Sequence, residues 1–384
     1  MDDLKLGNQK LMVACVGNAN DPNTFGGLPY HLVAAGITTG LIETGFSFME
    51  TQNRFKLARY SWNARQYFST GNSGGFQYSE TFLKNLWSSA PEQCKNTPIL
   101  NLFQLFPTSE MEKKSLKFFY LDQTLLDVFD YYGKGTNMSN SYRENIFTRE
   151  RMQYASADMV IFRSNWAANR AKTNYGLSDE RVSVVLPGAN IPQNTLSKIE
   201  DEYCILNAKK GELKLIFVGK EWYRKGLDRL LGAMRIAKVG GVKISLTVVG
   251  VKPEKFLLQL AKDLSVEWVG FIDKSLHPLT FARLLAKHDI GVLLSRNEAG
   301  GVSLREFGRL GLPVVAPDTG GSPEFAMSNN TYLFAPEVTN EVIAETFVNL
   351  AEDPYVLNQL KRDAWNRRHA FDWGTAVKKL SCLF

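Results

Sequence analysis

Short apolar runs alternate with stretches of helical periodicity along most of the chain. Near the N-terminus, the apolar run Leu11–Val16 ends at a glycine, a loop with Gly26 and Gly27 follows, and Leu28–Ile42 has a helical pattern. A buried strand, a glycine loop and a helix in this order open a doubly wound α/β domain. Further strands are predicted at Phe46–Met49, Ile99–Phe103, Lys117–Leu121, Met159–Phe162 and Val182–Val185.

The same alternation is clearer in the second half of the chain. Strands are predicted at Leu213–Val218, Lys243–Val249, Val266–Val269, Ile290–Leu294 and Val314–Ala316. Helices are predicted at Gly226–Ala237, Glu254–Leu264, Leu279–Lys287, Leu304–Leu310 and Pro323–Met327. Strands that alternate with helices at this spacing indicate βαβ units and a parallel sheet.

Between the two halves, Gln193–Lys214 is polar and suggests a domain boundary. The sequence therefore predicts two doubly wound domains in tandem, residues 1–195 and 210–368. Two parts of the first half resist this interpretation: Glu50–Pro98 is polar and aromatic without a clear period, and Asn137–Tyr142 is polar and is predicted to be a loop.

Composition narrows the class of protein. The 384 residues are 44% hydrophobic and 22% charged, which is ordinary for a globular protein. No apolar run approaches the roughly 18 residues of a membrane span, and no signal peptide is evident, so a cytoplasmic protein is expected. The cysteines (Cys15, Cys94, Cys204 and Cys382) are far apart, which favours reduced thiols over disulfides or a zinc site.

The net charge of +6 suits an anionic ligand or an anionic membrane surface, but a mixed, solvated surface is the favoured explanation. No nucleic-acid-binding motif is present, so no nucleic-acid partner is expected. The aromatic stretch Tyr60–Trp87 is a candidate for stacking on sugars, for peripheral membrane contact, or for ordinary core packing.

Three glycine-containing loops follow predicted strands. They are Gly26-Gly27, Gly219-Lys220, and Glu298–Ser303. Ligands of parallel α/β sheets bind beyond the carboxyl ends of the strands. The three loops are therefore expected to line one cleft between the domains.

The third loop has the features of a phosphate site flanked by acids. Its glycines let the backbone approach a ligand, and the helix that begins near Ser303 directs free N–H groups there. Lys220, Arg224 and Lys225 add positive charge, whereas the carboxylates of Glu298 and Glu306 would accept hydrogen bonds from hydroxyls. Phosphate with hydroxyls on both sides is the layout of a nucleotide sugar.

Simpler explanations exist for each of these residues. Ser303-Leu-Arg-Glu306 is also a capping box, in which the serine caps the helix and the glutamate reaches back. An exposed loop acid is the alternative for Glu298, a solvated surface charge for Lys225, and a tight turn for Gly26-Gly27.

With these motifs in view, the chain resembles retaining glycosyltransferases of the GT-B fold, in the large sucrose-synthase and mannosyltransferase-like family. The hallmark E-x7-E stands here as Glu298-AGGVSLR-Glu306, followed by GLPVVA (Gly311–Ala316). FVGKEWYRKG (Phe217–Gly226), GGLPYH in the first half, and FDWGTAVKKL (Phe371–Leu380) also resemble family segments.

The resemblance implies an acceptor-binding domain over residues 1–195 with a C-terminal helix, residues 371–384, that crosses back to it. It implies a donor-binding domain over residues 210–368 that faces the first domain across a cleft. The implied donor-binding residues are Gly27, Lys220, Arg224, Lys225, Gly270, Glu298, Gly301, Val302, Ser303 and Glu306. Among them, Glu298 would hold the transferred sugar and Glu306 the ribose.

Asp122 stands where the family often has a histidine. The resemblance therefore makes Asp122 a catalytic candidate, together with Glu298 and Lys225. No D-x-D motif is present, because Asp127 and Asp130 have the wrong spacing. No metal or other cofactor is therefore expected. In the mechanism that the family implies, the leaving phosphate takes the proton of the acceptor and configuration is retained.

The expected function is transfer of a sugar from a UDP- or GDP-sugar to a hydroxyl of a glycan, a lipid-linked sugar or a protein glycan. The expected location is cytoplasmic, with peripheral contact at the inner membrane face as an option. Two alternatives stay open: a non-catalytic protein that binds sugar nucleotides or glycans, and a phosphorylase or sugar-nucleotide epimerase of the same fold.

Overall fold

The computed structural model describes residues 6–7, 9–48, 53–71, 73–108, 115–134, 137–202, 208–327 and 331–384. Met49, at the end of one predicted strand, and Cys204 lie outside these residues. The chain divides into two compact units, Met1–Leu186 with Ala376–Phe384, and Pro187–Thr375. The division falls before the polar stretch in which the sequence suggested it, and the start of that stretch forms helix α7 (Gln193–Glu202).

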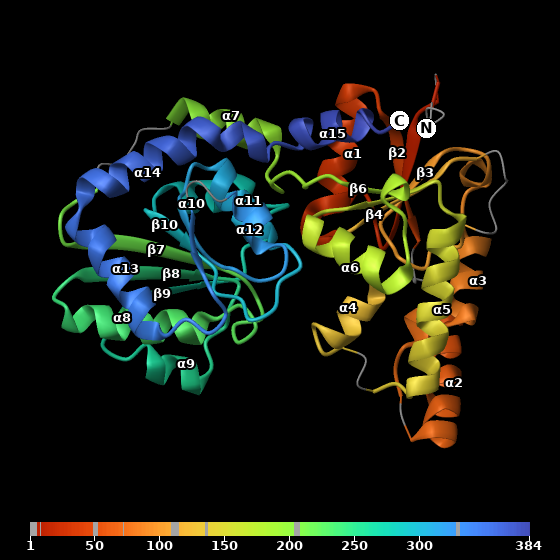
Figure 1. Ribbon diagram of the computed structural model, residues 1–384, viewed down its shortest axis with the longest axis horizontal. Coiled ribbons are helices and arrows are strands. Elements are labelled where there is room, and N and C mark those ends of the chain that lie inside the picture. The colour runs from red at the N-terminus through yellow and green to blue at the C-terminus, as the bar shows by residue number, and fades with distance from the viewer. Residues whose placement is uncertain are drawn as a thin grey trace. The chain divides into compact units, whose positions relative to one another are not determined.

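The first unit is built on a parallel sheet with the strand order β2-β1-β3-β4-β5-β6 (Figure 1). The strands are β1 Leu11–Val16, β2 Ile42–Phe48, β3 Ile99–Asn101, β4 Lys117–Leu121, β5 Met159–Phe162 and β6 Val182–Val184. The helices are α1 Leu28–Thr39, α2 Asn53–Thr70, α3 Glu80–Ser88, α4 Leu125–Asp130, α5 Asn140–Ser156 and α6 Asn165–Tyr175. In register, Val13 of β1 lies between Gly45 of β2 and Leu100 of β3.

The second unit repeats the plan, with the order β12-β11-β10-β7-β8-β9. Its strands are β7 Glu212–Val218, β8 Lys243–Val249, β9 Ser265–Gly270, β10 Ile290–Val292, β11 Val314–Pro317 and β12 Thr331–Phe334. Its helices besides α7 are α8 Leu227–Val239, α9 Lys255–Leu260, α10 Pro278–Ala286, α11 Val302–Arg309, α12 Ser322–Ala326, α13 Asn340–Glu352 and α14 Pro354–Arg367. Helix α15 (Trp373–Ser381) begins in this unit and ends in the first.

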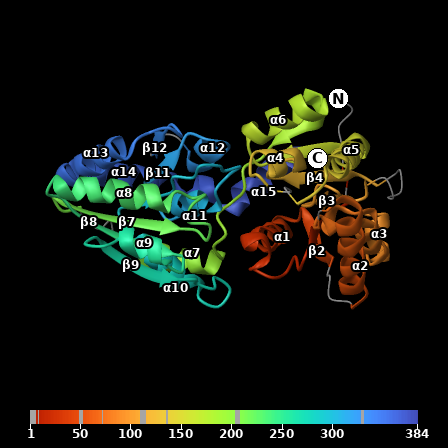
Figure 2. The same ribbon diagram turned by 90° about the horizontal axis from the view of Figure 1, so that it is seen from below.

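Every strand pair described in the two sheets is parallel, and helices flank each sheet, so both halves have the predicted doubly wound architecture (Figure 2). In each sheet the strand order reverses beside the first strand of the unit, between β1 and β3 and between β7 and β10. A reversal of this kind leaves a crevice at the carboxyl ends of the two strands, where ligands of such folds bind. The loops after β1, β7 and β10 are therefore the expected places for ligand binding.

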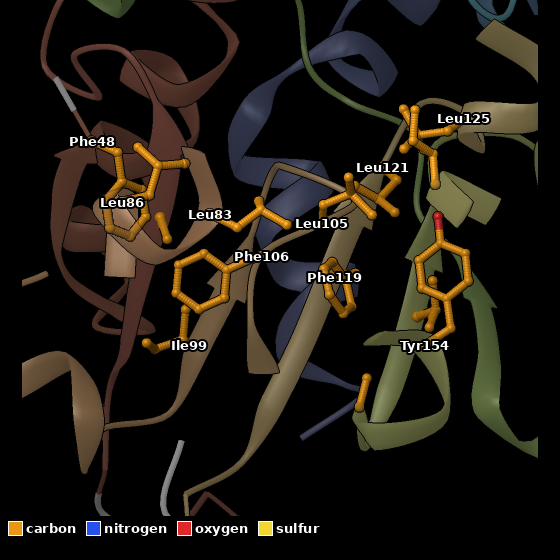
Figure 3. Packing of buried hydrophobic residues seen from close by; sticks show 14 of the residues in the cluster. Phe48, Leu83, Leu86, Ile99, Leu105, Phe106, Phe119, Leu121, Leu125 and Tyr154 are labelled. Atoms are coloured by element: carbon orange, nitrogen blue, oxygen red, sulfur yellow. The ribbon is translucent and has the colours of Figure 1, made fainter. Parts of the chain in front are cut away.

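The core of the first unit is strongly aromatic. Phe48 and Phe106 have ring centroids 5.4 Å apart, and Phe119 and Tyr154 have theirs 5.6 Å apart. Figure 3 shows these rings beside leucines such as Leu83 and Leu121. The stretch Glu50–Pro98, which had no clear assignment from the sequence, contributes Phe55, Phe76 and Phe82 to this core, which favours packing as the role of these aromatics.

A buried acid connects three helices of this core. The Glu150 carboxylate of α5 accepts the Leu125 N–H at the start of α4 (2.8 Å) and the hydroxyl of Tyr154 (2.6 Å). It also accepts the hydroxyl of Tyr175 at the end of α6. Burial raises the pKa of Glu150 from 4.5 to about 7, and these hydrogen bonds oppose the rise.

The predicted loop Asn137–Tyr142 is wrong in its second half, because α5 begins at Asn140. Ser139 caps this helix by accepting the N–H of Tyr142 at 3.3 Å. Helix α2 likewise occupies part of the stretch without an assignment. Among the described residues, no helix is both long and apolar enough to cross a membrane.

We expect Glu150→Gln to reduce the pH dependence of stability. Folding raises the pKa of Glu150, so its protonation stabilises the fold fully below about pH 4.5, and this contribution is lost as the pH rises through about 7. The substituted amide keeps an oxygen for Leu125 and Tyr154 and offers an N–H to Tyr175. The melting temperature should therefore fall less between pH 5 and pH 8.5 in the variant. An equal fall in both proteins would contradict this assignment.

Candidate functional site

In the second unit, two loops meet at the reversal of strand order. One follows β7 and contains Gly219 to Gly226, and the other follows β10 and leads to α11. At Gly226, φ is +73° and an added Cβ would lie 2.1 Å from the carbonyl oxygen of Leu294. At Gly219, a Cβ would lie 2.3 Å from Cδ of Lys225. Glycine at both positions allows the loops to touch and the Lys225 side chain to lie across the backbone.

Glu298 is the meeting point of these loops. Its Oε2 accepts hydrogen bonds from Lys225 Nζ (3.1 Å), Arg224 Nη1 (3.2 Å) and Ser295 Oγ (3.2 Å). Burial acts to raise the pKa of this carboxyl, but the charges of Lys225 and Arg224 outweigh it and the pKa is lowered. Glu298 is thus an ionised, buried acceptor, and the explanation of an exposed loop acid is wrong, because only 6% of the residue is exposed.

Glu306 lies on α11 and is 1% exposed. Burial raises its pKa, and an ion pair with Lys274 opposes the rise. The ammonium of Lys274 also lies 5.2 Å from the ring centroid of Phe281. The two acids therefore differ: nearby cations outweigh burial at Glu298 and lower its pKa, whereas burial outweighs Lys274 and the charge of Lys225 at Glu306 and raises its pKa.

Sequence reasoning missed Lys274, which lies in the turn after β9. The rule that selected the other loops, position just beyond the carboxyl end of a parallel strand, also applies to this lysine. A lysine shortly after a predicted strand was therefore the signal in the sequence that pointed to Lys274.

Helix α11 begins at a different residue from the one that the capping box requires. Its N-cap is Gly301, with φ of +99°, and no side chain caps it. Ser303 lies inside the helix, and its buried Oγ has no hydrogen-bond partner among the described residues. Because the first N–H groups of a helix have no intrahelical acceptor, those near Val302 and Ser303 are available to an anion. The capping box is therefore wrong, and Glu306 pairs with Lys274 instead.

Two buried arginines hold α11 in place within the second unit. Arg305 donates to the carbonyl oxygens of Pro187 (2.8 Å) and Ala370 (3.1 Å). Arg309 forms ion pairs with Glu200 (2.9 Å) and Asp372. The helix that carries Glu306 is thus fixed by segments from both ends of the unit.

Two other predicted donor residues of this unit are Lys220, in the loop after β7, and Gly270, at the end of β9. The Lys220 ammonium lies 4.6 Å from the ring centroid of Phe271. Gly270, the last residue of β9, has φ of +74° and open space where a Cβ would be. The structure thus brings Arg224, Lys225 and Glu298 together directly, while Lys220 pairs with an aromatic ring.

Gly27 and Asp122 belong to the first unit and follow β1 and β4. Gly27 is the N-cap of α1 with φ of +95°, and a Cβ there would lie 2.9 Å from the carbonyl oxygen of Pro22. This position requires glycine on steric grounds, which agrees with the tight-turn explanation and leaves a ligand role as a prediction. Asp122 is half-buried, and the next residue is held by Gln104, which donates to the Gln123 carbonyl oxygen at 2.9 Å.

Residues 199–368 match the family described as Glycosyl transferases group 1. The matched residues make up most of the second unit. The matched segment includes Lys225, Lys274, Glu298 and Glu306, and the match confirms the resemblance that the sequence motifs indicated.

Curated relatives carry compatible names. The D-inositol 3-phosphate glycosyltransferase of Rhodococcus erythropolis is 26% identical over 234 residues, which are 58% of this chain and 52% of the relative. An uncharacterized 41.2 kDa protein in the cps region of Klebsiella pneumoniae is 24% identical over 223 residues, 57% of each chain. The chain thus spans about half the length of the curated relatives it matches.

Solved structures match nearly the whole chain. Sucrose-phosphate synthase from Thermosynechococcus elongatus has a TM-score of 0.66 at 15% identity and covers 97% of this chain and 98% of its own. Anabaena HepE in complex with UDP has a TM-score of 0.64 at 15% identity with the same coverage. These likenesses show the fold, and the predicted GT-B class is confirmed.

We expect Lys274→Met to raise the pKa of Glu306 above its value in the parent protein. Burial already raises that pKa, and Lys274 is the main charge that opposes it. A carboxyl-carbon NMR titration measures the change. Lys243→Met is the matched control, because it removes a lysine from an exposed pair with Glu212 in the same unit. An unchanged Glu306 titration in Lys274→Met would show that this ion pair does not form.

Proposed function

We propose that this chain is a retaining glycosyltransferase that moves a sugar from a nucleotide-diphospho-sugar to a hydroxyl acceptor without a metal ion. The observation that carries the proposal is the pair of buried carboxylates of Glu298, before the glycine turn that starts α11, and Glu306, within that helix. Each has a lysine partner, and both lie where the sheet order selects a ligand site. The family match over residues 199–368 supports it.

Glu298 and Glu306 would recognise the hydroxyls at the two ends of the donor. A buried carboxylate offers strong acceptors, and hydrogen bonds to charged groups contribute roughly 1.5–3 kcal/mol, against about 1 kcal/mol for neutral ones. In the proposed arrangement, Glu298 accepts from the transferred sugar and Glu306 from the ribose. Backbone N–H groups near Gly301 and Val302 would hold the phosphate between them.

In this proposal, the cations beside Glu298 stabilise the leaving group. As the bond from the sugar to the diphosphate breaks, negative charge develops on the phosphate oxygen, and preorganised positive groups stabilise it. Lys225 has three N–H donors, so its ammonium can keep Glu298 and also contact a phosphate. The acceptor oxygen then bonds to the sugar carbon on the same face, and its proton passes to the leaving phosphate oxygen.

Glu298, Lys225 and Arg224 would therefore act on the reacting atoms. Asp122 stays a catalytic candidate of the first unit, and Lys220 a further contact for the diphosphate. HepE was solved with UDP-glucose, which makes UDP the first nucleotide to test, with GDP as the alternative. The acceptor is a hydroxyl of a glycan or of a lipid-linked sugar.

We expect transfer to survive EDTA. Lys225 and Arg224 already supply positive charge at the site, so charge neutralisation needs no divalent ion. Thermal shift with UDP and GDP identifies the nucleotide first, since a ligand at 100 times its Kd should stabilise by about 2.7 kcal/mol. Transfer from the matching sugar nucleotide is then followed with and without EDTA. Activity lost in EDTA and restored by Mg²⁺ or Mn²⁺ would contradict the metal-free mechanism, and binding without transfer would indicate a non-catalytic protein.

We expect Glu306→Gln and Glu298→Gln to affect different steps, nucleotide binding in the first variant and turnover in the second. Glu306→Gln should weaken binding of the free nucleoside diphosphate roughly tenfold or more, because a charged acceptor for the ribose is lost. Glu298→Gln should depress turnover and leave that affinity largely intact, because its partner is the transferred sugar. Calorimetry and turnover measure both.

Glu345→Gln, an exposed change on α13, is the control and should alter neither quantity. Normal nucleotide binding by Glu306→Gln, together with a lower melting temperature, would assign Glu306 to the stability of α11 instead.

A further inference from the structure

Helix α2 has two apolar faces. Phe55, Ala58 and Trp62 pack on the core of the first unit. A second set, Leu57, Tyr60, Ala64, Tyr67 and Phe68, recurs at spacings of three or four residues, with one adjacent pair. At about 100° per residue, this second set lies on the side of the helix opposite the core. We call these five residues the outer face of α2.

The outer face is open to solvent. The exposed fractions are 70% for Leu57, 75% for Tyr60, 59% for Tyr67 and 87% for Phe68. Tyr67 and Phe68 pack against each other with ring centroids 6.1 Å apart, so they form one surface. Single exposed apolar residues are common, but a contiguous apolar stripe usually marks an interaction surface.

The charge of the helix indicates the partner. Lys56 and Arg59 flank one side of the outer face and Arg65 the other, and Asn53–Thr70 contains no aspartate or glutamate. An apolar stripe bordered on both sides by cations is the pattern of a helix that lies in the interface of an anionic bilayer. Tyrosine suits this place because its ring is apolar and its hydroxyl is polar.

We propose that the outer face of α2 docks the protein on an anionic lipid bilayer. Leu57 and Phe68 are eleven residues apart, about 16 Å along a straight helix. A flat bilayer accepts the whole stripe at once, while the basic side chains on both flanks reach lipid phosphates. A protein partner would need a groove of this length with acids on both sides.

The position of α2 agrees with this role. In both views the helix lies at the outer edge of the first unit, beside α3 (Figures 1 and 2). None of the residues proposed for the donor site belongs to α2. The inference is therefore independent of the proposed function, and it predicts where an enzyme of this kind would meet an acceptor carried on a lipid.

The test is sedimentation of the full chain with vesicles of phosphatidylcholine alone or with 30% phosphatidylglycerol. The parent protein should bind the anionic vesicles and should be released by salt. Leu57→Ser with Phe68→Ser should lower the partition coefficient at least tenfold, because two apolar side chains no longer enter the bilayer. Lys56→Gln with Arg65→Gln should lower it by about 25-fold, since each charge is worth about fivefold near an anionic surface.

Two matched controls separate this surface from general stickiness and general charge. Val239→Ser with Tyr355→Ser removes two other exposed apolar side chains, and Lys378→Gln with Lys379→Gln removes two other exposed lysines. Both pairs should bind vesicles like the parent, and far-ultraviolet circular dichroism should show that every variant is folded.

Three outcomes would overturn the proposal. The first is equal binding of the parent and the outer-face variants to anionic vesicles. The second is absence of vesicle binding by the parent. The third is a parent dimer in solution that Leu57→Ser with Phe68→Ser converts to a monomer, without vesicle binding by either, which would assign the face to a second copy of the chain.

Discussion

The second unit depends on the compensation of charge along one buried helix. Arg305, Glu306 and Arg309 of α11 are each no more than 2% exposed. A buried charge without a partner destabilises a fold by several kcal/mol, so each of these side chains must have one. Their partners come from the segments before β7, after β9 and around Asp372, and this requirement fixes where those segments run.

The same compensation determines how the two glutamates behave. Glu298 has cations from the loop after β7 and is held as an anion, whereas burial raises the pKa of Glu306 although the charges of Lys274 and Lys225 oppose the rise. The sequence motif presents two equivalent acids, but their surroundings make them different.

Much of the fold follows from the sequence because strands of parallel sheets are short apolar runs. β1, β4, β5 and β8 have the predicted bounds. Helices α2 and α5 were not predicted, because α2 has apolar residues on two faces and α5 is largely polar, so neither shows a single stripe. The glycine loops and both acids of the site were predicted from their order along the chain.

What the sequence did not reveal depends on contacts between distant residues. The Lys274–Glu306 pair joins residues 32 positions apart, and the ion pair of Arg309 with Glu200 spans 109 positions. The misassigned capping box has the same origin, because Ser303 and Glu306 fit the motif, yet Gly301 begins the helix before Ser303 is reached. Local sequence patterns can indicate which residues form a site, but the partners of those residues depend on contacts that form only in the folded chain.

The anchoring of α11 also bears on how small an independently folding piece of this chain can be. The family match ends at residue 368 and begins at residue 199. Pro187, Ala370 and Asp372, which neutralise or satisfy Arg305 and Arg309, lie outside those limits. A fragment cut at the family boundaries would bury two guanidinium groups with part of their partners missing. The segment that folds independently is therefore expected to extend beyond the residues that match the family model at both ends.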